Sequence, residues 1–200
     1  MIIYGAGAAG IETLALLFKE IKIRDICFFD NNLSKKSIEM GKYGFPVIHT
    51  EEDLLAFIRH TDDNRYLVTV GHSRLREKMV KKISKLPVKP YTYISKHAWV
   101  LNEEAIDHGS VIHPNTFTSF QSSIGKFVSL HVNTTVGHKV KIGDYINIGP
   151  GCNIIGPCII ESHCFIGAGS IIYPGVKIGK QAIISAGSII KNDIPDYYSV

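Results

Sequence analysis

The residues with the clearest potential for chemistry lie near the N-terminus, where positions 5–10 read Gly-Ala-Gly-Ala-Ala-Gly. This is a GxGxxG pattern, and an acidic residue, Asp30, follows it by twenty positions. A turn of this kind at the start of a helix offers backbone N–H groups to a phosphate, and an acid after the second strand can contact a nucleotide. The predicted binding residues are Gly7, Ala8, Ala9, Gly10, Asp30 and Asn31. The alternatives are that the glycines only permit a tight turn and that Asp30 caps the loop after it. Arg74 is a further candidate for phosphate contact, with a helix-surface charge as the alternative.

The histidines do not predict a metal site. His113 and His131 are eighteen residues apart, and His108 precedes His113 with an HxxxxH spacing. A zinc site needs at least three converging protein ligands. No third histidine occupies a matching position, so no metal is expected.

The elements that must position the glycine turn alternate between strand and helix. The predicted strands are 1–4, 26–29, 45–48, 66–70 and 88–94, and the predicted helices follow the turn and span 51–59 and 75–84. In the first helix Leu14, Leu17, Phe18 and Ile21 share one side. This alternation predicts a small parallel sheet with helices on its faces. About 95 residues hold only one mononucleotide-binding half of a doubly wound fold, so NAD is not expected.

The second half has a six-residue repeat. Stepping by six from Val100 to Ile190 gives sixteen positions, and all except Thr118 are aliphatic. Such a step, with frequent glycine at the next position, predicts short strands that turn repeatedly in a left-handed parallel β-helix, with eighteen residues per coil. We expect an α/β domain at 1–95 and a β-helix domain at 96–200, with Trp99 packed over the first coil.

The cysteines fit the same repeat. Cys152, Cys158 and Cys164 are six apart and fall on small inward positions, so we interpret them as core residues. With no CxxC pair and no dense framework, a reducing cytoplasm is the expected location.

Composition narrows the classes of function. Of the 200 residues 45% are hydrophobic and 20% charged, which excludes a disordered chain. No segment has the length of a membrane span, and the first residues lack the pattern of a signal peptide, so no membrane insertion is expected. A net charge of +4 suits small phosphate-bearing ligands and is too small to predict nucleic-acid binding.

The whole chain resembles bacterial sugar acyltransferases of the sialic-acid O-acetyltransferase type, which include N-acetyltransferases of nucleotide-linked 4-amino sugars. The similarity rests on GAGAAG at 5–10, FFDNN at 28–32, VGHSRLR at 70–76, NTTVGHKVKIGDY at 133–145 and the hexads. It implies a homotrimer that binds acetyl-coenzyme A (acetyl-CoA) between subunits and a nucleotide-sugar on the N-terminal domain. We also predict His131 and Asn147 as substrate residues, with a solvated turn residue as the alternative for His131. The predicted coenzyme residues are Gly156, Gly167, Ala168 and Ala186.

The resemblance implies that His138 is the catalytic base. Its imidazole could accept the proton of an amine or hydroxyl that attacks a thioester. Gly156 is eighteen residues further on, so we expect it one coil away on the same side, where its N–H could bind the oxyanion. Direct attack within a ternary complex needs no acetyl-enzyme.

Three positions depart from the pattern of these relatives. Lys139 replaces the carboxylate that commonly follows the base, His131 replaces an asparagine, and Asn147 replaces a second histidine. The chain also lacks a Gly-x-Pro-Ala ending, so whether it continues beyond Val200 stays open, as do the nucleotide, the sugar and the acyl length. The function we predict is N-acetylation of a nucleotide-linked amino sugar in surface-glycan synthesis. The alternatives are O-acetylation of a sialic acid or related sugar, and a non-catalytic nucleotide-sensing trimeric scaffold.

Overall fold

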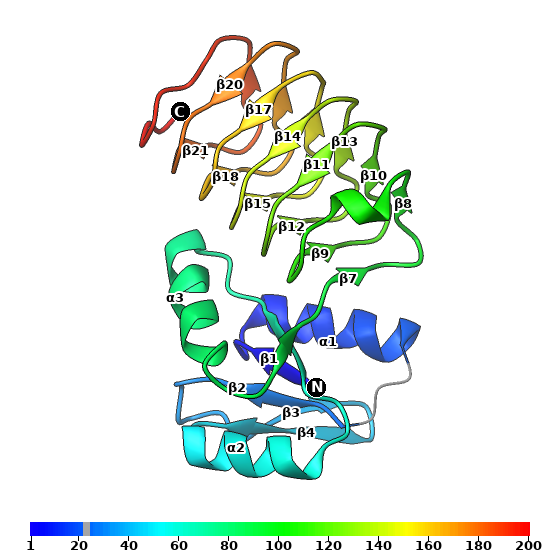
Figure 1. Ribbon diagram of the computed structural model, residues 1–200, viewed down its shortest axis with the longest axis vertical. Coiled ribbons are helices and arrows are strands. Elements are labelled where there is room, and N and C mark those ends of the chain that lie inside the picture. The colour runs from blue at the N-terminus through cyan, green and yellow to red at the C-terminus, as the bar shows by residue number, and fades with distance from the viewer. Residues whose placement is uncertain (22–24) are drawn as a thin grey trace. The chain divides into compact units, whose positions relative to one another are not determined.

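The computed structural model of the protein describes residues 1–21 and 25–200. The chain forms two compact units, Met1–Tyr91 and Thr92–Val200, each described here by itself (Figure 1). The sequence placed the boundary four residues later, between 95 and 96.

Within residues 1–21 and 25–91, the N-terminal unit is a six-stranded sheet with three helices. Its strands are β1 (Ile2–Tyr4), β2 (Cys27–Phe29), β3 (Ser37–Met40), β4 (Tyr43–Ile48), β5 (Arg65–Val68) and β6 (Lys89–Pro90). Its helices are α1 (Ala8–Glu20), α2 (Glu51–His60) and α3 (Ser73–Ile83). The strand order is β3-β4-β2-β1-β5-β6, and all pairs are parallel except β3 with β4. The predicted α/β sheet is confirmed.

The chain direction places the helices on both faces of this sheet. Helix α1 connects β1 to β2, whereas α2 and α3 accompany steps in the opposite direction across the sheet. Because such crossovers are right-handed, α1 lies on one face and α2 and α3 lie on the other. An ion pair of 3.1 Å between Lys82 of α3 and Glu51 of α2 agrees with this arrangement.

A buried arginine fixes the segment that leaves β5. Arg76 donates from Nε to the carbonyl oxygen of Val70 at 2.8 Å and from Nη2 to that of Gly71 at 3.2 Å. Burial lowers the pKa of Arg76 to about 10, so the guanidinium stays charged at neutral pH. Its charge is satisfied by carbonyl dipoles at the carboxyl edge of the sheet.

Two of the predicted strands were wrong in extent. The strand expected at 45–48 is the second arm of an antiparallel hairpin, whose turn contains Gly41 at a φ of +60°. The strand expected at 88–94 is divided between two sheets. Strand β6 joins the N-terminal sheet, whereas β7 (Tyr93–Ile94) pairs with the β-helix, because Pro90 and the boundary between the units interrupt it.

The C-terminal unit is a parallel β-helix with three walls. The first wall contains β7, β9 (Val111–Ile112), β12 (Ser129–Leu130), β15 (Asn147–Ile148), β18 (Phe165–Ile166) and β21 (Ile183–Ile184). The second contains β8 (Trp99–Val100), β10 (Phe117–Thr118), β13 (Thr135–Val136), β16 (Asn153–Ile154), β19 (Ile171–Ile172) and β22 (Ile189–Ile190). The third contains β11 (Ser123–Ile124), β14 (Lys141–Ile142), β17 (Ile159–Ile160) and β20 (Lys177–Ile178), and a 3₁₀ turn, Glu103–Ala105, precedes it.

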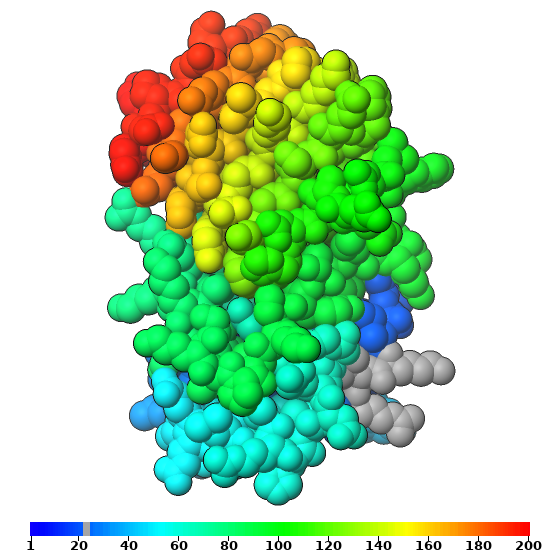
Figure 2. Space-filling view, viewed as in Figure 1, coloured from blue at the N-terminus to red at the C-terminus, as the bar shows by residue number. Residues whose placement is uncertain are grey.

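Neighbouring coils are paired eighteen residues apart, as in Val136 with Ile154 and Ile142 with Ile160. The hexad residues point inward, and all except the partly buried Val100 are buried. The predicted β-helix is therefore confirmed, and the coils appear as stacked bands of colour in Figure 2.

The cysteine prediction is confirmed, whereas that for Trp99 is wrong. Cys152, Cys158 and Cys164 are free and buried, and burial raises the pKa of Cys158 to about 11 and that of Cys164 to about 12. Trp99 does not cover the first coil. It lies on the outer side of β8 and is 72% exposed, because the alternation of the strand places Val100 inward instead.

No helix among residues 1–21 and 25–200 combines the length and apolar character needed to cross a membrane.

Candidate active site

The glycine turn leads directly from β1 into α1. Gly5 has a φ of +110°, Gly7 is the N-cap of α1, and no side chain caps that helix end. Gly7 and Ala8 are exposed, Ala9 is half-buried and Gly10 is buried. The first turn of α1 contains no acidic residue, so its N–H groups can attract an anion.

Asp30 holds this turn in place. One carboxylate oxygen accepts the Ala6 N–H at 2.6 Å and the other accepts the Asn32 N–H at 2.8 Å. Lys35 donates from Nζ to the carbonyl oxygen of Ala6. The contact with Asn32 is the loop-capping role that the sequence left as the alternative. Ligand binding by Asp30 stays a prediction.

The turn offers a matched pair of glycine substitutions. A Cβ on Gly10 would lie 2.0 Å from the carbonyl oxygen of Gly5, whereas a Cβ on Gly7 would meet no atom within 4 Å. We expect Gly10→Ala to lower the free energy of unfolding by about 1–3 kcal/mol, in the range for overpacking, and Gly7→Ala to leave it nearly unchanged. Urea denaturation of both variants tests this.

If Gly7 binds a phosphate, Gly7→Ala should still weaken nucleotide binding, because the new methyl group lies beside the exposed N–H. Equal stability of the two variants would contradict the packing role of Gly10.

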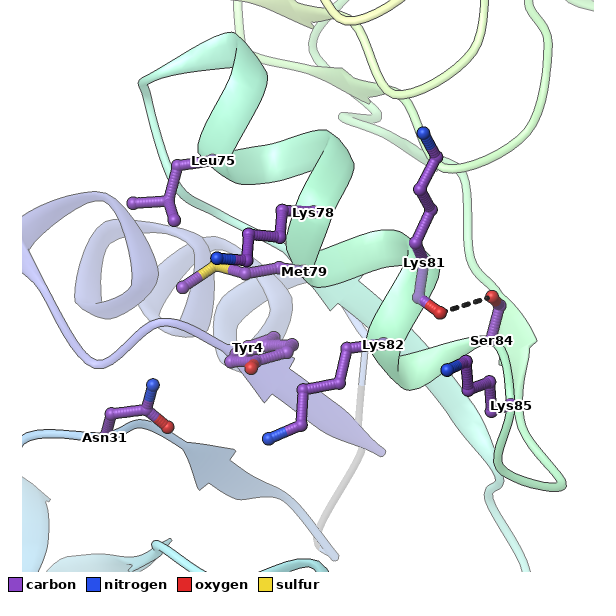
Figure 3. A pocket seen from close by; sticks show the side chains of 9 residues that line it. All are labelled: Tyr4, Asn31, Leu75, Lys78, Met79, Lys81, Lys82, Ser84 and Lys85. Carbon is purple, nitrogen blue, oxygen red and sulfur yellow. Dashed lines mark hydrogen bonds between the residues drawn. The ribbon is translucent and has the colours of Figure 1, made fainter.

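A pocket of about 840 Å³ opens beside the turn (Figure 3). Tyr4, the last residue of β1, and Asn31, just beyond β2, line it together with α3 and the residues after α3. Its other lining residues are Leu75, Lys78, Met79, Lys81, Lys82, Ser84 and Lys85. Of these nine lining residues, only Asn31 was predicted from the sequence as a binding residue.

In the β-helix, His138 and Gly156 lie at the corner between the second and third walls, which we call the second corner. His138 follows β13 by two residues and Gly156 follows β16 by two, so they occupy equivalent positions in successive coils. A Cβ on Gly156 would lie 1.7 Å from the carbonyl oxygen of His138. The predicted stacking of these two residues is therefore present in the structure.

The His138 side chain is exposed at this corner, and its ring stacks on that of Phe120 one coil earlier, with centroids 5.8 Å apart and planes at 14°. Phe120 was not predicted, although its position eighteen residues before His138 could have indicated it. No carboxylate in the described part of the chain forms a hydrogen bond or ion pair with the imidazole. The next residue, Lys139, has a φ of +58° and carries an ammonium group, so it cannot act as the carboxylate partner of the imidazole.

The N–H of Gly156 is available as a donor. Gly156 is buried, and none of the hydrogen bonds among the described residues uses its N–H. A Cβ on Gly137 would lie 2.7 Å from the nitrogen of Gly156. Because Gly137 has no side chain, nothing from that position covers this N–H.

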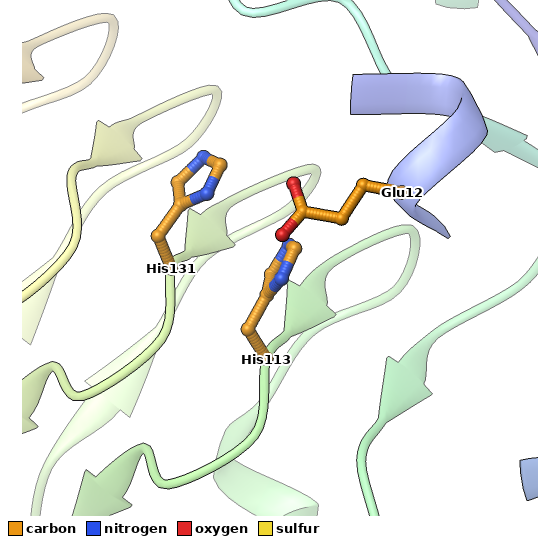
Figure 4. Close-up of side chains that lie close together, drawn as sticks. All are labelled: Glu12, His113 and His131. Atoms are coloured by element: carbon orange, nitrogen blue, oxygen red, sulfur yellow. The ribbon is translucent and has the colours of Figure 1, made fainter. Parts of the chain in front are cut away.

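The other candidates in this unit lie along the corner between the first and second walls, the first corner, or on the first wall beside it. His131 Nε2 is 3.4 Å from Oδ1 of Asn147. The rings of His113 and His131 stack with centroids 4.7 Å apart (Figure 4). Burial and the imidazole of His131 lower the pKa of His113 to about 4, so His113 is neutral at neutral pH. Two positions that depart from the relatives, His131 and Asn147, are thus in contact.

The predicted coenzyme residues other than Gly156 also lie along the first corner. Gly167 and Ala168 follow β18 and Ala186 follows β21, one coil later, and a Cβ on Gly167 would lie 2.4 Å from the nitrogen of Ala186. Both alanines are exposed. Small residues in this column leave a shallow surface on which an extended ligand can lie. Within one chain, the second wall separates this column from His138 and Gly156.

Comparison with known proteins gives evidence on the two units and their relatives that is independent of the geometry described above. Residues 1–83 match the model of the PglD N-terminal domain, and residues 157–192 match the hexapeptide repeat of succinyl-transferase. GDP-perosamine N-acetyltransferase of Escherichia coli O157:H7 is 29% identical over 142 residues, which are 68% of this chain and 61% of the relative. The chain thus spans about three-fifths of that relative.

Solved structures match over the whole chain. WeeI from Acinetobacter baumannii AYE is 27% identical with a TM-score of 0.88, covering 100% of this chain and 94% of its own. The acetyltransferase domain of PglB from Neisseria gonorrhoeae FA1090, solved with acetyl-CoA, is 26% identical with a TM-score of 0.84 and the same coverage. The chain thus combines a part that matches the PglD N-terminal domain with a hexapeptide-repeat β-helix, and it is similar to sugar acetyltransferases in both sequence and fold.

Proposed function

We propose that the protein transfers an acetyl group from acetyl-CoA to the amino group of a nucleotide-linked sugar, of the 4-amino-4,6-dideoxy type, in surface-glycan synthesis. The observation that carries this proposal is the pairing of an exposed imidazole, His138, with the unused N–H of Gly156 on the next coil. A base and an oxyanion donor in adjacent positions are what acyl transfer from a thioester needs.

In the proposed reaction the sugar nitrogen attacks the thioester carbonyl carbon directly. His138 accepts the proton that the nitrogen loses, and the Gly156 N–H donates to the carbonyl oxygen as negative charge develops on it. When the tetrahedral intermediate collapses, the carbon–sulfur bond breaks and the sulfur of coenzyme A takes the proton back from His138. Phe120 holds the imidazole by stacking on its face. No metal and no acetyl-enzyme take part.

The substrate class follows from the relatives and from the N-terminal unit. The named relative acts on GDP-perosamine, an amino sugar linked to a nucleotide, and the N-terminal unit matches the PglD N-terminal domain. We assign nucleotide-sugar binding to the N-terminal unit, Met1–Tyr91, through the turn from Gly7 to Gly10 with Asp30 and Asn31, and acyl transfer to the C-terminal unit, Thr92–Val200. His131 and Asn147 contact the sugar, and Gly156, Gly167, Ala168 and Ala186 contact the coenzyme.

The active site is complete only in a homotrimer in this proposal. The second wall lies between the His138 corner and the column of Gly167, Ala168 and Ala186. If three copies turn their second walls toward a common axis, the second corner of one copy meets the first corner of the next. The outer side of the second wall fits such an interface, since it carries apolar side chains, including Trp99, 72% exposed, and Ile189, 56% exposed.

One substitution can test whether the second wall faces the axis of the proposed trimer. We expect Ile189→Asp to shift the protein from trimer to monomer in light scattering coupled to size exclusion, because a carboxylate on the packed wall is costly to desolvate. The matched control is Ile159→Asp on the third wall, where the native side chain is 41% exposed. A trimer that survives Ile189→Asp and dissociates with Ile159→Asp would show that another wall faces the axis.

The experiment for the function itself is thiol release from acetyl-CoA with GDP-, UDP- and dTDP-linked 4-amino sugars and with free sialic acid. We expect turnover of one nucleotide-linked amino sugar, with the acetyl group on nitrogen by NMR. Turnover of sialic acid alone would establish O-acetylation instead. Nucleotide binding without any turnover of the panel would favour the sensing scaffold. We place the enzyme in the cytoplasm, which agrees with its free thiols.

A further inference from the structure

The pocket beside the glycine turn has a strongly basic wall. Four lysines line it, Lys78, Lys81, Lys82 and Lys85, and no acidic side chain is among its described lining residues. These lysines are spaced i, i+3, i+4 and i+7 along α3 and the residues just after it, so they form one stripe, which we call the lysine stripe.

Repulsion within the lysine stripe is only partly relieved. Lys81 pairs with Glu77 at 2.7 Å and Lys82 with Glu51 at 3.1 Å, whereas no ion-pair partner of Lys78 is found among the described residues. Like charges at i, i+4 destabilise a helix, and Lys78 and Lys82 have this spacing. A cation near the C-terminus of a helix interacts favourably with the helix dipole. This explains the positions of Lys81 and Lys82 in the last turn of α3, but not that of Lys78 in the middle of the helix.

The lysines differ in direction. In Figure 3 the side chains of Lys78 and Lys82 extend to the side of α3 where Tyr4 and Asn31 lie, whereas Lys81 extends away from them. Lys82 is held there by Glu51 and by the ring of Phe29, whose centroid is 5.5 Å from its Nζ. The two ammonium groups on this side are therefore placed toward the pocket.

The remaining lining supplies hydrogen bonds and apolar contact. The Asn31 side chain is exposed and its amide takes no hydrogen bond within residues 1–21 and 25–200, so it is available to a ligand, whereas Tyr4 is 1% exposed and only forms part of the pocket wall. Leu75 and Met79 add apolar surface. A volume of about 840 Å³ is in the range of small-molecule sites. A ligand that carries several negative charges beside a flat apolar ring matches this lining.

We propose that this pocket binds the diphosphate of a nucleoside diphosphate, with Lys78 and Lys82 neutralising the phosphates and Asn31 donating to them. The inference rests on the proposed function, because it assigns part of the nucleotide-sugar to residues outside the glycine turn. Tyr4 directly precedes the turn, and Asn31 follows Asp30, which holds it. One nucleotide can thus contact both the turn and the lysine stripe.

The test is titration calorimetry of GDP, UDP, dTDP and inorganic pyrophosphate with the full chain and its Lys78→Gln and Lys82→Gln variants. We expect at least one of these ligands to bind, and each variant to bind it about tenfold more weakly, as for loss of a charge-assisted hydrogen bond. The matched control is Lys19→Gln, an exposed lysine in the last turn of α1 that does not line the pocket, and this variant should bind as the wild type does. Lys78→Gln should not lower the melting temperature of the free protein, because it removes repulsion.

The outcomes separate this inference from the proposed function. Unchanged nucleotide binding in both Lys78→Gln and Lys82→Gln would overturn the assignment of the phosphates and leave acetyl transfer untouched. An equal loss in Lys19→Gln would also overturn it, since only the general charge of the N-terminal unit would then matter. A selective loss of pyrophosphate binding in an enzyme that acetylates no nucleotide-linked sugar would support the pocket while the proposed function fails.

Discussion

His138→Ala is expected to lower kcat for acetyl transfer by a factor of about 10² to 10⁴, the usual contribution of a general base. The KM for acetyl-CoA and the melting temperature should change little, because the imidazole is exposed at the second corner and stacks only on an exposed ring, Phe120. Steady-state kinetics with the nucleotide-linked amino sugar found in the substrate panel, together with thermal unfolding, measures both.

A second histidine of the same unit provides the control. His108 is exposed and pairs with Asp107 at 2.7 Å, away from the second corner, so His108→Ala should retain the wild-type kcat. A His138→Ala enzyme within a few fold of the wild type would remove His138 from the role of base. It would make His131, which is half-buried in the same unit, the next candidate to test.

The β-helix could be predicted from the sequence because its repeat is local and strict. Each coil repeats the same inward positions, and one insertion would have displaced every later residue from the core, so fifteen aliphatics at sixteen positions leave little alternative. The stacking of His138 and Gly156 follows from the same count of eighteen. Lateral contacts such as that of His131 with Asn147, sixteen residues apart, depend on how side chains lean across the wall. The repeat does not encode that.

The N-terminal unit was less predictable because its pairings are not local. The hairpin arm Ser37–Met40 has only four residues, and no hydrophobic run marks it. The segment 88–94 has continuous strand character in sequence, but its two ends pair with different sheets. The pocket was missed for a related reason. The spacing of its lysines is the same as that of an ordinary solvent-exposed helix face. Only the order of the strands in the sheet places them opposite Tyr4 and Asn31.

Gly156→Ala is expected to lower kcat by about 10² to 10³, close to the effect of losing an oxyanion donor, although alanine keeps the N–H. The reason is displacement. The new Cβ would lie 1.7 Å from the carbonyl oxygen of His138 and 2.8 Å from its carbonyl carbon, both of which are backbone atoms and cannot rotate away. One or both coils must shift at the second corner, and the donor moves relative to the base. The same clash should lower the free energy of unfolding by about 1–3 kcal/mol.

A glycine at another corner separates the catalytic effect from the general cost of such a clash. In Gly125→Ala the Cβ would lie 2.7 Å from the carbonyl carbon and oxygen of Gly143, at the corner between the third and first walls. We expect this variant to lose stability as Gly156→Ala does and to keep most of its kcat at a temperature where both variants are folded. Equal losses of kcat in the two variants would mean that activity follows the rigidity of the coils. A selective loss in Gly156→Ala would mean that acyl transfer depends on the position of one N–H relative to His138, which is the arrangement that the eighteen-residue coil maintains.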